Sequence, residues 1–149
     1  MNDRIVLVTT TFSKSVEDVR AQLALKTCRA ARDNDYPIIV VDGSPCEEFK
    51  QALRETGATV IDQKKPGMGQ SRRECFDAGL STGADVIAWL EPEKYTLVPL
   101  LGPCVSPVLS GEVDVVIPRR RNLDGYPQYQ HWSELRANWE LGNITKRFD

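Results

Sequence analysis

The stretch PGMGQSRRECFDAGLSTGADVIAWLEPE, residues 66–93, decides the fold that the sequence predicts. A glycine-rich turn leads into a helix that carries Arg72 and Arg73, and an apolar strand follows and ends on Glu91 and Glu93. In open α/β sheets, ligands bind beyond the carboxyl ends of the strands. We therefore expect these cations and carboxylates to meet at one sheet edge and to form a metal and phosphate site.

The residues before this stretch alternate between strand and helix patterns. Continuous aliphatic and β-branched runs predict buried strands at residues 4–10 and 37–42, and a shorter strand at 59–62. Periodic apolar residues predict a helix of about 18 residues between the first two strands, up to Asp33. Short connections of this kind favour βαβ units, so the expected fold is α/β with a mostly parallel sheet flanked by helices and the first strand at its centre.

Two helix starts are predicted from capping residues. Ser15 with Asp18 three residues later resembles a capping box before the first helix. Ser44 is followed by Pro45 and by Glu47, which predicts an N-cap, a proline at the first helical position and a capping acid, and Gly57 is expected to end that helix.

The C-terminal third is less regular. Prolines at 99, 103 and 107 predict short or broken helices. Residues 114–118 (DVVIP) read as a further strand, and residues 131–142 as an amphipathic helix with Trp132, Leu135 and Trp139 on one side.

Composition limits the class of protein. The chain has 149 residues, 41% of them hydrophobic, which suits one compact domain. A net charge of −2 argues against nucleic acid as a partner. The chain has no apolar run of about 18 residues and no signal-peptide pattern at its start, so we expect a cytoplasmic protein without a transmembrane segment. Four cysteines, none in CxxC spacing, are expected to be reduced and mostly buried rather than zinc ligands or disulfides.

Three motifs together carry a resemblance to a known family. They are VVDGS at residues 40–44, GMGQSRRECFDAGLSTGAD at 67–85 and WLEPEK at 89–94. In this order and spacing they resemble the nucleotide-sugar-dependent glycosyltransferases of the GT-A fold, close to the family-two type. The resemblance implies a Rossmann-like nucleotide-sugar-binding core at residues 1–118. The basic loop and final helix at 119–149 would then form a partial acceptor-side region.

The resemblance also implies ligands. Asp42 would contact the base of a UDP- or GDP-linked sugar, and Glu91 and Glu93 would take the place of the family's DxD acids and bind Mn²⁺ or Mg²⁺ and the ribose. Residues two apart in an extended chain point the same way, so both glutamates can approach one ion if Pro92 keeps the backbone extended. Glutamates in place of aspartates lengthen both arms. The acceptor is not indicated, and a homo-oligomer is compatible with the sequence.

Further residues are candidates for donor binding. Thr10 and Thr11 end the first strand, beside the expected nucleotide site, although β propensity alone also explains them. Gly69 belongs to the turn whose backbone N–H groups favour an anion. Of the neighbours Arg72 and Arg73 we expect one to bind phosphate, because adjacent helical residues point about 100° apart.

The C-terminal candidates are a metal ligand and two acids. His131, the only histidine, is a candidate third metal ligand, as in many members of this fold. Asp124 and Glu134 are the candidate general bases for an inverting transfer. Residues 119–121 (RRR), with Tyr126 and Tyr129, read either as a site for an anionic acceptor or the diphosphate, or as a solvated loop.

Two other functions remain open from the sequence. A sugar nucleotidyltransferase would also use acidic metal ligands on an α/β sheet, but it is expected to carry a glycine-rich loop after the first strand, and residues 9–18 contain no glycine. A non-catalytic or partner-dependent nucleotide-binding module would keep the fold without turnover, and the EPE variant and short C-terminal part suit it. The leading hypothesis is a metal-dependent glycosyltransferase.

Overall fold

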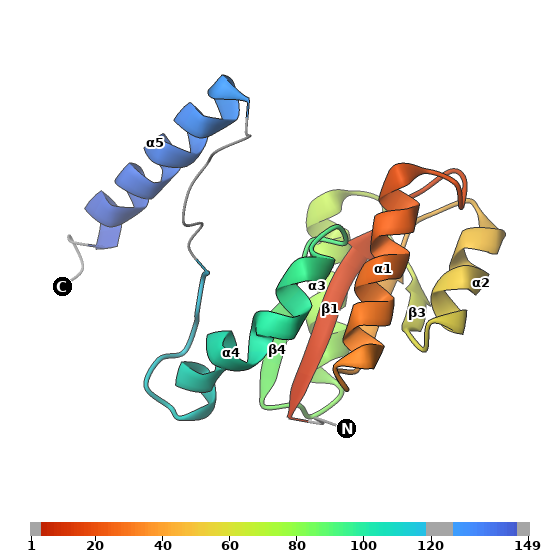
Figure 1. Cartoon of the computed structure of the whole chain (residues 1–149), viewed down its shortest axis with the longest axis horizontal. Coiled ribbons are helices and arrows are strands. Elements are labelled where there is room, and N and C mark those ends of the chain that lie inside the picture. The colour runs from red at the N-terminus through yellow and green to blue at the C-terminus, as the bar shows by residue number, and fades with distance from the viewer. Residues whose placement is uncertain (1–3, 119–126, 146–149) are drawn as a thin grey trace. The chain divides into compact units, whose positions relative to one another are not determined.

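The computed structural model describes residues 4–118 and 127–145. The chain divides into two compact units, Met1–Val116 and Ile117–Asp149, and each is described by itself (Figure 1). The division falls after Val116, close to the predicted end of the core at residue 118.

The first unit is built on one sheet of four parallel strands. The strands are β1 (Ile5–Thr11), β2 (Ile38–Asp42), β3 (Thr59–Asp62) and β4 (Val86–Trp89), in the order β3-β2-β1-β4. The predicted α/β class with a parallel sheet and an inner first strand is therefore confirmed. All of β2 is buried, because helices cover both faces of the sheet and its run of Ile and Val has no polar alternation.

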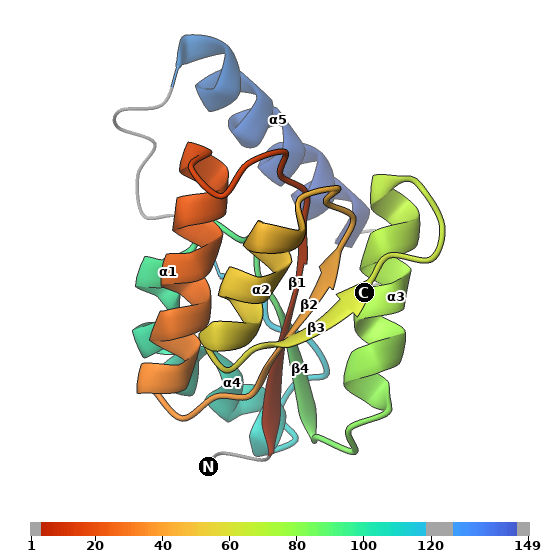
Figure 2. The same cartoon turned by 90° about the vertical axis from the view of Figure 1, so that its right-hand side faces the viewer.

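Helices cover the sheet unequally. Figure 2 shows α1 (Val19–Asp33) and α2 (Glu47–Glu55) on one side of the strands and α3 (Met68–Leu80) on the other. The 3₁₀ helix η1 (Tyr95–Leu100) and α4 (Leu101–Leu109) pack into the same core as α1 and α2. The prolines thus give short helices, as predicted.

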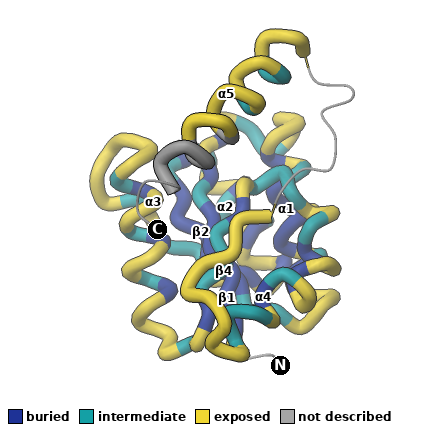
Figure 3. The backbone as a smooth tube through the Cα atoms, turned by 90° about the vertical axis from the view of Figure 1, so that its left-hand side faces the viewer, coloured by how far each residue is buried: buried dark blue, intermediate teal, exposed yellow. Residues whose placement is uncertain are grey.

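The core has two layers because strand side chains alternate between faces. Ile5 and Leu7 point to the α1 side, and Val6 and Val8 to the α3 side. In Figure 3 the buried positions follow the strands and the inner faces of the helices that surround them.

The helix α3 approaches the sheet closely at Gly79. A Cβ atom at this position would lie 3.0 Å from Ile87 Cγ2 and 3.2 Å from Val8 Cγ1. A methyl group would be a tight fit here, because the helix lies against two strands and the Ile87 and Val8 side chains would have to give by a few tenths of an ångström. The start of α3 is set by Gly67, whose φ of +111° is unfavourable for other residues.

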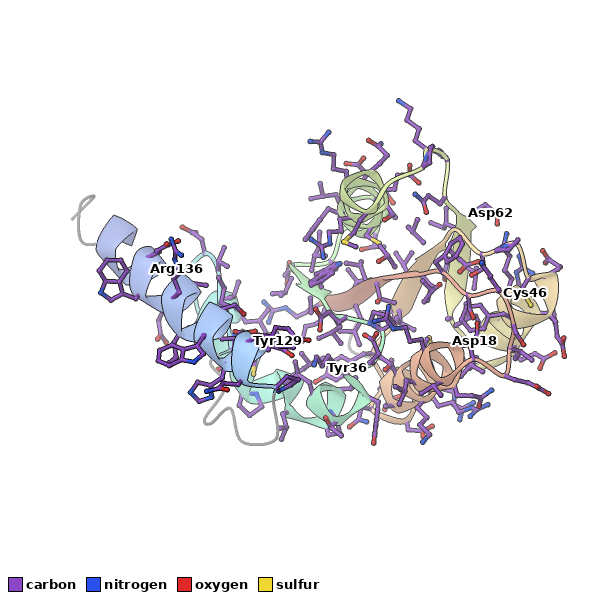
Figure 4. The ribbon with its side chains drawn as sticks, turned by 90° about the horizontal axis from the view of Figure 1, so that it is seen from above. Asp18, Tyr36, Cys46, Asp62, Tyr129 and Arg136 are labelled. Carbon is purple, nitrogen blue, oxygen red and sulfur yellow. The ribbon has the colours of Figure 1, made fainter. Side chains whose placement is uncertain are left out.

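Both predicted helix starts are wrong by a few residues, for the same reason. The helix α1 begins at Val19, after Asp18, and α2 begins at Glu47, after Cys46; Asp18 and Cys46 are labelled in Figure 4. Ser15 donates its N–H to Asp18 Oδ2 at 3.3 Å, and Ser44 bonds to Asp42, so both serines hold loops instead of capping helices. The predicted end of α2 near Gly57 is right, since Glu55 is its last residue and Gly57 has φ +94°.

The strand predicted at residues 114–118 does not form. These residues have no regular secondary structure and pair with no strand among the described residues, and Val115 and Ile117 are 71% and 78% exposed. A β-branched run becomes a strand only where a neighbouring strand offers hydrogen bonds.

The second unit contributes the helix α5 (Gln128–Thr145). Trp132, Leu135 and Trp139 are exposed on it. Figure 4 labels Tyr129 and Arg136 of this helix, and Arg136 pairs with Glu140 one turn later. Among the described residues, no helix has the length and apolar character needed to cross a membrane.

Candidate functional site

A cleft lies at the carboxyl ends of β1 and β4, where the first loop, the start of α1 and the start of α3 meet. Its volume is about 600 Å³, within the range of small-ligand sites. Its floor carries Thr10, Thr11 and Trp89, and charged side chains surround it. The predicted sheet edge thus carries a cavity of ligand size.

Glu91 and Glu93 both line this cleft, but through a turn and not an extended chain. Lys94 donates its N–H to the Glu91 carbonyl at 3.0 Å, which closes a four-residue turn with Pro92 in its second position. Proline favours that position because its fixed φ suits it. The extended EPE backbone, given above as the condition for both acids to approach one ion, is therefore not present, although both acids line the same cavity.

Two hydrogen bonds hold this turn on the core. Thr27 of α1 donates its hydroxyl to the Pro92 carbonyl at 2.6 Å, and Thr9 of β1 donates to the Leu90 carbonyl at 2.7 Å. Both donors are buried, so the backbone that carries the acids is fixed from below. The acids project from a rigid support, as a binding site requires.

Each acid lies beside a cation of the same cleft. Glu93 Oε1 is 3.6 Å from Arg20 Nε, and Glu91 Oε2 is 3.6 Å from Lys94 Nζ. These side chains are partly exposed, so the pairs are weak and can be exchanged for ligand contacts. Arg20, Arg72 and Lys94 together outnumber the two carboxylates on the cleft lining.

Arg72 is the arginine of α3 that faces the cleft. Its guanidinium carbon lies 4.8 Å from the centroid of the Trp89 ring, which also lines the cleft. Stacking on an aromatic face orients the guanidinium and leaves its N–H groups at the edge free for an anion. Arg73 is not on the lining, so the structure selects Arg72 from the two neighbours.

Asp42 lies below the cleft and not on its surface. It is 1% exposed and does not line the cavity. Thr11 Oγ1 and Ser44 Oγ both donate to its Oδ1 at 2.6 Å, and Ser44 N–H donates to Oδ2 at 3.1 Å. Ser44 Oγ in turn accepts the N–H of Ser13 at 2.7 Å. Asp42 therefore ties the ends of β1 and β2 together. Its carboxylate does not reach the surface of the cleft, where the predicted contact with a nucleotide base would be made.

Some of the remaining candidates for binding the sugar donor line the cleft and others do not. Thr10 and Thr11 line the cleft, and the Thr11 hydroxyl is already used on Asp42. Gly69 lies inside α3 and not on the lining, whereas Gly67, at the helix start, does line it. The helix N-terminus and its dipole thus face the cavity through Gly67 and Met68.

The C-terminal candidates cannot be placed in the cleft. His131 and Glu134 lie on α5, in the second unit. Asp124, Tyr126 and the arginines at 119–121 lie outside the described residues. These assignments stay predictions.

Several residues of the cleft were missed from the sequence: Phe12, Ser13, Arg20, Gln63, Met68 and Trp89. Phe12 and Met68 are exposed apolar side chains on its rim, and Gln63 donates Nε2 to the Lys65 carbonyl. Met68 and Trp89 lie within two of the quoted motifs but were given no role there, and the other four residues lie outside every motif. Their position directly after a predicted strand, or at a helix start, was the available signal.

Cys75 is buried and does not line the cleft. Its Sγ lies 3.0 Å from the Thr9 carbonyl, and burial raises the pKa of its thiol to about 11. A neutral buried thiol is a poor nucleophile. All four cysteines are free, as predicted, and Cys28 is also buried, but Cys46 and Cys104 are only partly buried, so the expected burial holds for two of the four.

The donor set fits a divalent ion only in part. Within the ranges described, no group of three or more His, Cys, Asp or Glu side chains is arranged to hold a metal. Mg²⁺ and Mn²⁺ are, however, often held by one or two carboxylates together with substrate phosphates. Glu91 and Glu93 fit that shared mode, in which the ligand completes the coordination.

Comparison of the chain with protein-family models, with curated proteins and with solved structures gave no match. The expected relation to glycosyltransferases therefore stays a prediction from the three sequence motifs.

Proposed function

We propose that the chain binds a nucleoside-diphosphate sugar, UDP- or GDP-linked, in this cleft and transfers the sugar to an acceptor with the help of Mn²⁺ or Mg²⁺. The observation that carries the proposal is one cavity at the carboxyl ends of β1 and β4 that combines two carboxylates, three cations and a helix N-terminus. A diphosphate with a bridging metal needs these three features together.

The parts of the cleft suit different parts of the donor. Phe12 and Met68 offer apolar surface for a planar base on the rim, and Thr10 offers its hydroxyl and Thr11 its backbone near it. Arg72, fixed on Trp89, is placed to bind a phosphate oxygen beside the start of α3. Glu91 and Glu93 close the other side.

The chemistry needs charge neutralisation at the leaving group. A metal held by Glu91, Glu93 and the diphosphate would act as Lewis acid and template. Arg72 orients the diphosphate and stabilises the negative charge that develops on it when the glycosidic bond breaks. For an inverting transfer, the acceptor hydroxyl needs a base, for which Asp124 and Glu134 remain the proposed residues.

Calorimetry with UDP and GDP, each with and without Mn²⁺, tests the binding step. The expected result is binding of one nucleoside diphosphate that strengthens with Mn²⁺, and slow release of free sugar from the matching donor. Binding without any hydrolysis or transfer across a donor and acceptor screen would favour the non-catalytic module. No binding of either nucleotide would refute the proposal.

A further inference from the structure

The charged side chains that line the cleft have a net positive charge, and this charge affects which ligands can bind. Arg20, Arg72 and Lys94 face Glu91 and Glu93, so the lining carries a formal charge of +1. Each glutamate is within 3.6 Å of its own cation, Arg20 for Glu93 and Lys94 for Glu91. The carboxylates that would bind a metal are therefore already compensated.

A divalent cation alone enters an unfavourable field. It would raise the local charge from +1 to +3 and would have to displace Arg20 and Lys94 from the carboxylates. A nucleoside diphosphate alone, with a charge of about −3 at neutral pH, leaves the cleft negative. The two ligands together bring the local charge to zero, and the phosphates give Arg20 and Lys94 a new partner.

We propose that Arg20 and Lys94 are positioning residues that couple the two ligands: they pair with Glu93 and Glu91 in the free protein and move to phosphate oxygens when metal and nucleoside diphosphate bind together. The inference rests on the proposed function and adds a prediction of how the affinities for metal and for nucleotide depend on each other. Neither ligand binds well alone, and each strengthens the other by the same factor, as linkage requires.

The side chains are suited to this exchange. Arg20 is the second residue of α1 and its side chain is 83% exposed, so it can swing without disturbing the core. Lys94 follows Glu93 directly and its side chain is 39% exposed. The turn that carries both acids is held by buried Thr27 and Thr9, so the cations can move while the carboxylates stay in place.

The test is calorimetry of the full chain with Mn²⁺ alone, UDP or GDP alone, and each in the presence of the other. We expect the nucleotide to strengthen Mn²⁺ binding at least tenfold, within the usual range of coupling. Arg20→Gln and Lys94→Gln should each strengthen binding of Mn²⁺ alone about two- to fivefold, because one repulsive charge is gone, and weaken nucleotide binding in saturating Mn²⁺ by a similar factor. These opposite shifts would not arise from a merely structural defect.

Arg29→Gln is the matched control, since it removes the same charge from an exposed position of α1 outside the cleft lining. It should change neither affinity. Nucleotide binding that is indifferent to Mn²⁺, or Arg20→Gln and Lys94→Gln variants in which both affinities fall together, would overturn the coupling while leaving the nucleotide site in place. Absence of nucleotide binding under every condition would overturn the proposed function and, with it, this inference.

Discussion

Arg72 and Arg73 are neighbours in the sequence and differ in the structure. The sequence predicted that only one of them binds phosphate, because adjacent helical residues point apart, but it could not say which. Packing against Trp89 places Arg72, and not Arg73, on the cleft lining. The choice depends on Trp89 of β4, and the periodicity of a helix does not reveal a contact with a residue on another element.

This difference gives a matched pair of variants. Arg72→Gln should weaken UDP or GDP binding in Mn²⁺ about tenfold, since it removes a charge-assisted hydrogen bond. Arg73→Gln removes the same charge one residue away and should change the affinity less than about twofold. Calorimetry compares the two. Equal losses would show that general charge, and not the stacked guanidinium, attracts the nucleotide.

A substitution of Glu93 tests whether the glutamates of the cleft bind the metal. Glu93→Ala should abolish the Mn²⁺-dependent part of nucleotide binding while the melting temperature stays nearly unchanged, because a cleft acid at a strand end is not part of the core. Glu48→Ala, an exposed acid of α2 outside the cleft, is the control. A large loss of stability with retained binding would overturn the assignment.

Asp42 was predicted as a nucleotide contact and is instead a buried acceptor of three hydrogen bonds. Asp42→Ala should lower the free energy of unfolding by about 2–3 kcal/mol, because Thr11 and Ser44 lose a buried charged acceptor. Urea unfolding followed by circular dichroism measures this. Unchanged stability together with lost nucleotide binding would restore the predicted role. Nothing in the VVDGS motif alone distinguishes an acid that binds a ligand from one that joins two loops.

At the scale of elements, the strands were predictable and some helix starts were not. Continuous buried runs give β1 and β2 directly, since both faces of a parallel sheet are covered, whereas the edge strand β3 is recognised from its short β-branched run although none of its residues is fully buried. The start of α2 depends on what Ser44 bonds to, and its hydroxyl is used by Asp42 and Ser13. The apolar run at 114–118 has β propensity but no strand to pair with. Tertiary partners decided each of these cases.

Alanine substitutions at two glycines of α3 are expected to change the stability of the protein in opposite directions. Gly79→Ala should destabilise the protein by about 1–3 kcal/mol, because the new methyl group would press on Ile87 and Val8. Gly69→Ala should be stabilising by about 0.5–1 kcal/mol, because a Cβ there meets no atom within 4 Å and alanine favours a helix. Denaturant unfolding of both variants checks the signs. A neutral Gly79→Ala would mean that α3 can shift away from the sheet.

At the scale of the molecule, the core and the cleft both belong to the first unit. The buried cores run from Ile5 to Val105, and the cleft is lined by residues from Thr10 to Lys94. The sequence located this sheet edge because strand ends in a parallel sheet share one edge. It could not locate the rim residues Phe12 and Gln63, which come from loops without a motif, and it gave no role to Met68, the first residue of α3. The roles given to Asp124, Glu134 and His131 stay predictions, since they belong to the second unit.

This division predicts that a fragment of residues 1–116 is a folded nucleotide-binding protein. Its free energy of unfolding should lie close to that of the full chain, because no residue of either buried core is removed. UDP or GDP affinity in Mn²⁺ should be unchanged within about twofold, whereas sugar transfer should be lost with Asp124 and Glu134. Calorimetry, chemical unfolding and a donor turnover assay on both proteins make the comparison. A fragment that folds but no longer binds nucleotide would show that residues 117–149 complete the site, and the cleft at the ends of β1 and β4 would then be only one part of it.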